Sequence, residues 1–161
     1  MKTLSDAFVH TLEDIYYAEN AIAKALPKVI SEVTNTDLRT ALQDHLKETK
    51  GQIKVLGDVF KVIGKSAKGE KCDAIEGLIK ECEGVMAEAK GPVAKHAMII
   101  GCCQAIEHYE IARYGTLREW AKALGEQEAH DLLSGILDQE KAANHKLTHL
   151  AITEVNGSRK G

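Results

Sequence analysis

Apolar side chains recur every three or four residues along most of this 161-residue chain, and proline occurs only as Pro27 and Pro92. This spacing follows the 3.6-residue turn of an α-helix and places the apolar side chains on one face. Runs in which apolar and polar residues alternate, the pattern of a half-buried strand, are absent. The sequence therefore predicts an all-α fold built from long amphipathic helices.

Five helices are predicted from the apolar stripes and from the residues that bound them. Gly64 and Gly125 are expected to end two helices, because glycine tolerates the left-handed conformation that follows a helix C-terminus. Pro92 suits a first helical turn, and Ser5 is the expected N-cap of the first helix. The predicted ranges are about 5–33, 36–63, 73–89, 92–124 and 126–155.

The lengths of the connections predict how these helices are arranged. The first two helices are joined by a short turn, as are the last two, so each pair is expected to form an antiparallel hairpin. The connection between the hairpins is long and contains the short helix at 73–89. We expect one four-helix bundle over residues 1–155 with an additional helix in the crossover, followed by a flexible tail at 156–161.

Charge and hydropathy argue against two classes of partner. A net charge of -3 gives no basic surface of the kind that binds nucleic acid. The most apolar run, HAMIIGCC, is far shorter than the roughly 18 apolar residues of a membrane span. The N-terminal stretch MKTLSDAFVHTLED turns acidic without an apolar core, so no signal peptide is expected.

The chain has four cysteines, Cys72, Cys82, Cys102 and Cys103, and no CxxC motif. A chain of this length can fold without disulfides, so we expect reduced thiols and a cytoplasmic protein. Cys102 and Cys103 are interpreted as small core residues. For Cys72 and Cys82 an alternative stays open, a redox pair between the start of the short helix and its middle.

Acidic residues occupy positions at which the apolar stripes of three long helices would otherwise continue. They are Glu19 in the first helix, Glu107 and Glu110 in the fourth, and Glu140 in the last. With a turn of about 100° per residue, these positions face the bundle interior. Counting residues from the turn also places Glu107 and Glu110 level with Glu140. The carboxylates are therefore predicted to converge inside the bundle.

The second helix is expected to bring an imidazole and a fifth carboxylate to the same region. His45 faces inward, whereas Glu48 lies at the edge of that face, about 80° from its centre. Buried carboxylates are costly, and neighbouring ones repel each other. Bound metal cations would neutralise them, so the pattern predicts a metal site in the bundle core. For any one carboxylate, the alternative is a solvated helix face.

The stretches DIYYAENAIAKALP, HLKETKGQI, KCDAIEGLIKE, AIEHYEIARYGTL and LDQEKAANHKLTHLA touch every predicted helix. On these stretches the chain resembles the YciE/YciF family of bacterial ferritin-like stress proteins. The resemblance implies a ferritin-like bundle, a homodimer, and a di-iron-type carboxylate site that could also take manganese. It implies that the metal ligands are Glu19, Glu48, Glu107, Glu110 and Glu140, with Glu48 as a bridging ligand and Glu107 as its counterpart.

The chain departs from the ferritin-like pattern at two positions. Members normally carry Glu-x-x-His on the second and last long helices, but Gly51 and Ala143 stand where those histidines would be. His45, three residues before Glu48, could supply an imidazole from the other direction. Two functions stay open: a metal centre that reacts with oxygen or peroxide or handles iron, and a non-enzymatic, metal-free dimeric stress protein that acts by protein interaction.

Overall fold

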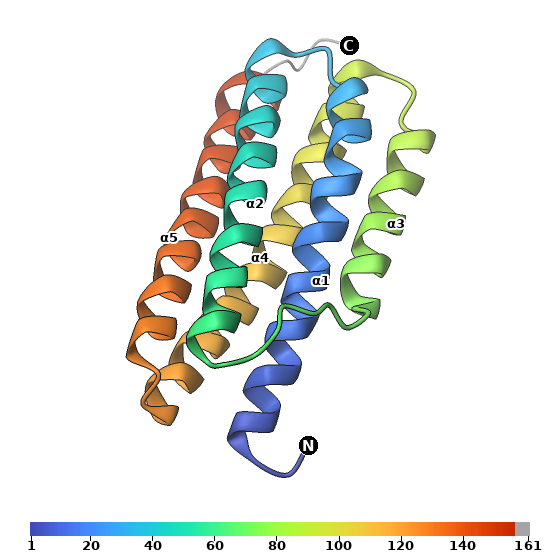
Figure 1. Ribbon diagram of the computed structural model, residues 1–161. Coiled ribbons are helices and arrows are strands. Elements are labelled where there is room, and N and C mark those ends of the chain that lie inside the picture. Colours follow the sequence, from blue (N-terminus) through green and yellow to red (C-terminus); the bar gives the residue numbers. More distant parts are fainter. Residues whose placement is uncertain (157–161) are drawn as a thin grey trace.

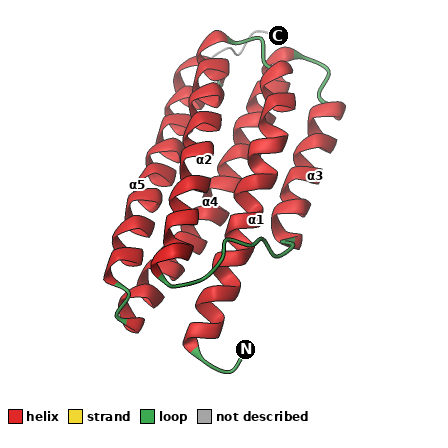
Figure 2. Ribbon diagram, in the orientation of Figure 1, coloured by secondary structure: helices red, strands yellow, loops and turns green. Residues whose placement is uncertain are grey.

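The computed structural model describes residues 1–156, and within that range it is all-α (Figure 2). The helices are α1 (Leu4–Ser31), α2 (Thr36–Val62), α3 (Asp73–Glu88), α4 (Pro92–Leu124) and α5 (Gln127–Leu150), and the π-helical turn η1 (Ala151–Val155) continues α5. The five predicted helices are confirmed. Apart from Asn156, the predicted tail at 156–161 lies outside the described residues.

Four of the α-helices form a bundle, and α3 packs against its outside (Figure 1). The hairpins are α1–α2 and α4–α5, with α2 against α5 and α1 against α4, while α3 contacts α1 and α4. The end of α2 and the start of α4 lie at opposite ends of the bundle. The connection that contains α3 therefore runs back along the bundle. No helix within residues 1–156 combines the length and the apolar character needed to cross a membrane.

The helix ends agree with the prediction at the two glycines and differ from it at the start of α1. Gly64 and Gly125 have φ angles of 69° and 78°, in the left-handed region that favours glycine. The N-cap of α1 is Thr3, and the prediction of Ser5 was wrong. The Thr3 hydroxyl accepts the Asp6 N–H at 3.1 Å, and the Asp6 carboxylate accepts the Thr3 N–H at 3.1 Å.

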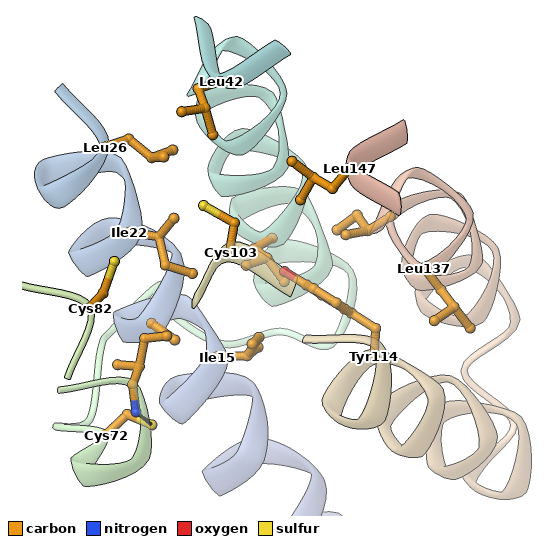
Figure 3. Close-up of a cluster of buried hydrophobic side chains, with 14 of the residues drawn as sticks. Ile15, Ile22, Leu26, Leu42, Cys72, Cys82, Cys103, Tyr114, Leu137 and Leu147 are labelled. Atoms are coloured by element: carbon orange, nitrogen blue, oxygen red, sulfur yellow. Dashed lines mark hydrogen bonds between the residues drawn. The ribbon is translucent and has the colours of Figure 1, made fainter. Parts of the chain in front are cut away.

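Apolar side chains from all five α-helices form the core (Figure 3). In order from α1 to α5, Ile15, Leu42, Cys82, Tyr114 and Leu147 are examples, and each is at most 5% exposed. This packing surrounds the polar side chains of the bundle interior and shields them from water.

The positions of the cysteines exclude a redox pair between Cys72 and Cys82. Cys72 is the N-cap of α3, where its sulfur accepts the Ile75 N–H at 3.4 Å. Cys82 lies ten residues further along the same helix, a rise of about 15 Å, whereas a disulfide joins Cα atoms no more than about 7 Å apart. Cys72 instead contacts the Tyr109 hydroxyl at 3.0 Å. All four cysteines are free thiols, as predicted.

Candidate metal centre

Four glutamates lie inside the bundle, at the positions where the apolar stripes of their helices are interrupted. Glu19 projects from α1, Glu107 and Glu110 from α4, and Glu140 from α5. Each is at most 1% exposed. The predicted inward orientation of all four is therefore observed, while their role as metal ligands stays a prediction.

The acidic side chains form two groups that share Glu110. In the first group, one ligand atom each from His45, Glu107 and Glu110 lies within 4.8 Å of the others. In the second group, the same holds for Glu19, Glu110 and Glu140. Three donor atoms this close can bind one cation, and a shared carboxylate has two oxygens with which to bridge neighbouring cations.

Neighbouring polar side chains hold two of these carboxylates in place. The Tyr114 hydroxyl donates a hydrogen bond to Glu19 Oε1 at 2.5 Å. On α2, the buried Gln52 amide donates to Glu140 Oε1 and also to Gln139 Oε1 at 3.2 Å. In each of these two carboxylates, Oε1 accepts a hydrogen bond and Oε2 has no hydrogen-bond partner.

Glu48 lies at the rim of this region and belongs to neither group. Its side chain is exposed, in keeping with its predicted place at the edge of the inward face of α2. It lines a pocket of about 100 Å³ that reaches His45 and Glu107 from the surface and passes beside Lys146. His45 Nε2 lies 3.4 Å from Glu107 Oε1. His45 thus belongs to the first group, whereas Glu48 lines the same pocket as Glu107 and its charge contributes to the raised pKa of Glu107 and Glu140.

The two positions that lack the expected histidines have different surroundings. Gly51 is exposed, and a Cβ atom added there would meet no other atom within 4 Å. An imidazole at position 51 would therefore point away from the buried carboxylates, and His45 occupies the inward face of α2 instead. Ala143, in contrast, lines the pocket beside Glu107. Its small side chain leaves open the space that a histidine of α5 would fill.

Burial sets the protonation of this cluster. Desolvation, followed by repulsion from Glu140, raises the pKa of Glu19 to about 8. Desolvation is also the main cause that raises the pKa of Glu107, Glu110 and Glu140 above the usual glutamate value. It lowers the pKa of His45 to about 4, so this imidazole is neutral at pH 7 and can act as a ligand. Without a cation, the carboxyl groups are therefore held largely in their neutral form.

The residues present fit a pair of transition-metal cations. One oxygen of each buried glutamate has no hydrogen-bond partner, and neither has Nδ1 of His45; the oxygens are Oε2 of Glu19, Glu107, Glu110 and Glu140. A buried polar atom without a partner is costly, and a bound cation would remove that cost. Carboxylate oxygens with one imidazole suit iron and manganese in their divalent states.

Two features of the site go beyond the sequence-based prediction. Gln52 donates a hydrogen bond to Glu140, and this bond depends on the contact between α2 and α5. Asn144 is half-buried and accepts a hydrogen bond from Gln104 at 3.3 Å, and it belongs to neither group. No signal within a single helix could have predicted either contact, since both form between helices.

The family model described as "Domain of unknown function (DUF892)" matches residues 3–159. Protein YciF of Escherichia coli K12 is 42% identical over 157 residues, which are 97% of this chain and 95% of that protein. The crystal structure of the E. coli stress protein YciF superposes with a TM-score of 0.93 over 99% of this chain and 100% of that one. The structure of YcfI from Rhodopseudomonas palustris, which is 48% identical, superposes with a TM-score of 0.90 over 91% of this chain and 94% of that one. The chain therefore belongs to the DUF892 family and is a homologue of the stress protein YciF.

Proposed function

We propose that this protein binds two metal cations in its bundle core, iron or alternatively manganese, and uses them in redox or iron-handling chemistry during stress. The observation that carries the proposal is the pair of three-residue groups that share Glu110. Each buried glutamate in these groups also keeps one oxygen without a partner. Such a set of atoms is costly in an apolar core unless cations neutralise it.

In this proposal, some side chains bind the cations and others orient the ligands. His45, Glu107 and Glu110 would hold one cation, and Glu19, Glu110 and Glu140 the other, while Tyr114 and Gln52 fix the orientation of Glu19 and Glu140. A bound redox-active metal would supply electrons to a small oxidant such as oxygen or peroxide. The pocket beside His45 and Glu107 is large enough for such a molecule and opens to solvent past the exposed Glu48.

A second candidate function is a metal-free dimeric stress protein that acts through protein interaction in the cytoplasm. The proximity of the carboxyl groups favours it: Glu107 lies close to Glu140, and Glu19 lies close to Glu110. Protonated carboxyl pairs could satisfy one another without a cation. The absence of a histidine at Ala143 points the same way.

Metal analysis of protein prepared without chelators separates the two functions. We expect about two iron or manganese ions per chain for the wild type. The double substitution Glu107→Gln and Glu140→Gln is expected to abolish binding, because it removes an anionic ligand from each group. Glu128→Gln, on the exposed face of α5, is the matched control and should keep the full metal content.

The opposite outcome would support the metal-free function. In that case the wild type holds no iron or manganese above the level of the double variant. The double variant would then unfold at the same or a higher temperature than the wild type, because glutamine removes two groups whose ionisation opposes folding and keeps an amide that can hydrogen-bond in place of each carboxyl group.

A further inference from the structure

Three thiols meet where α3 packs on α4, and one of them, Cys103, also lines the pocket beside His45 and Glu107. Cys82 projects from α3, and its thiol lies close to the Cys102 thiol of α4. Cys103, the next residue of α4, lies near both sulfurs. Cys82 and Cys103 belong to the buried cluster drawn in Figure 3. Among the described residues the thiols do not form a group close enough to chelate a metal.

The three thiols differ in their access to solvent. Cys82 and Cys103 are only 4% and 7% exposed. Cys102 is half-buried and lines a groove of about 220 Å³ between α3 and α4, together with Leu78 and Met98. A small oxidant in this groove would therefore reach the Cys102 sulfur before the buried Cys82 sulfur, which lies close to it.

We propose that Cys82 and Cys102 form a redox modification site, at which hydrogen peroxide produces a disulfide between α3 and α4. Peroxide first oxidises the Cys102 thiol to a sulfenic acid and releases one water. The Cys82 sulfur then attacks the Cys102 sulfur, the S–O bond breaks, and the Cys82 proton leaves with the hydroxyl group as a second water. Two thiols and one peroxide thus give one disulfide and two waters.

The environment makes this reaction slow. The thiolate is the reactive form of cysteine, and burial raises the pKa of Cys82 to about 12 and that of Cys102 above its usual value. We therefore expect the disulfide to accumulate under sustained peroxide exposure and not within seconds. Because α3 lies outside the four-helix bundle, the bond would fasten the crossover helix to α4 and raise the Tm by about 5 to 10 °C.

Peptide mapping of the full chain tests this inference. The protein is kept in EDTA, so that the outcome does not depend on the proposed metal centre, then treated with hydrogen peroxide and alkylated. We expect the loss of two of the four free thiols per chain and a linked peptide pair containing Cys82 and Cys102. Cys82→Ser and Cys102→Ser should abolish the link. Cys72→Ser is the matched control and should keep it, since serine can also cap α3.

Several results would overturn the inference. They are a wild type that keeps four free thiols after hours in peroxide, a link from Cys82 to Cys103 in place of Cys102, and a bond that forms between chains instead of within one. The peptide map of the wild type decides among these outcomes even if a serine variant fails to fold.

Discussion

Glu110 is the residue on which the proposed metal centre depends most, because it contributes to both groups of ligand atoms. Its pKa is raised by burial and then by the charges of Glu19, Glu140 and Glu107, so it lies among the other three acids. A carboxylate in that position has no role in packing the apolar core. We propose that it bridges two cations.

The Glu110→Gln substitution is therefore expected to lower metal content more than Glu19→Gln does. Gln at position 110 removes the shared anionic oxygen, and we expect a fall from about two ions per chain to none, whereas Gln at position 19 should leave about one. Elemental analysis after loading with Mn²⁺ and gel filtration measures both, with Glu128→Gln as the control. Equal losses in the two variants would show that Glu110 is not shared.

Single residues were predictable where helical phase alone decides their position. The phase of Glu19, Glu107, Glu110 and Glu140 follows from the apolar residues on either side in the same helix. The burial of Glu48 was harder to predict. Its position is about 80° from the centre of the inward face, so a small rotation of the helix decides whether the side chain lies in the core or in solvent. The structure puts it in solvent at the pocket rim.

At the scale of the helices, the capping residues determine where each helix begins. The reciprocal hydrogen bonds between Thr3 and Asp6 fix the start of α1. The signal was present in the sequence as a threonine three residues before an acid, but Ser5 also precedes the apolar stripe and was assigned as the cap. Two candidates of similar chemistry that lie two residues apart cannot be separated by composition alone.

The Thr3→Ala substitution is expected to destabilise the protein by about 1 kcal/mol, because the Asp6 N–H loses its acceptor. For a chain of this size that corresponds to a fall in Tm of about 2 to 4 °C. Ser5→Ala, within the first turn of α1, should change the free energy of unfolding by less than about 0.5 kcal/mol. Urea denaturation measures both variants. A larger effect at Ser5 than at Thr3 would contradict the observed cap.

At the scale of the whole molecule, the buried carboxyls couple stability to pH. In the metal-free fold their pKa values are raised, whereas in the unfolded chain they ionise near pH 4.5. The unfolded state therefore releases protons that the fold retains, and stability falls as pH rises from 4.5 through the folded values. The lowered pKa values of His45 and His96 act in the opposite sense below about pH 7.5, where the unfolded imidazoles bind protons that the folded ones do not.

We expect the free energy of unfolding in EDTA to fall between pH 7.5 and 8.5, the window in which the two histidines are at least nine-tenths neutral in both states. Urea denaturation across this range measures the slope. Glu19→Gln should flatten part of it, because the pKa of Glu19 is about 8 in the fold. A stability that stays level or rises over the same range in EDTA would show that the acids are ionised without a cation.

The bundle topology was predictable, because connection length separates hairpins from crossovers and helical period separates helices from strands. The docking of α3 on α1 and α4 was not predicted, since its apolar stripe specifies a buried face but not the partner of that face. The meeting of Cys82 with Cys102 follows from that docking. Contacts of this kind lie between elements, where sequence spacing carries little information.

The most direct test is an anomalous diffraction map, recorded at the iron edge, from crystals grown with Fe²⁺. We predict two peaks in the bundle core, one among His45, Glu107 and Glu110 and one among Glu19, Glu110 and Glu140. A map without density at either position, with the glutamates paired to one another through hydrogen bonds, would contradict the metal centre.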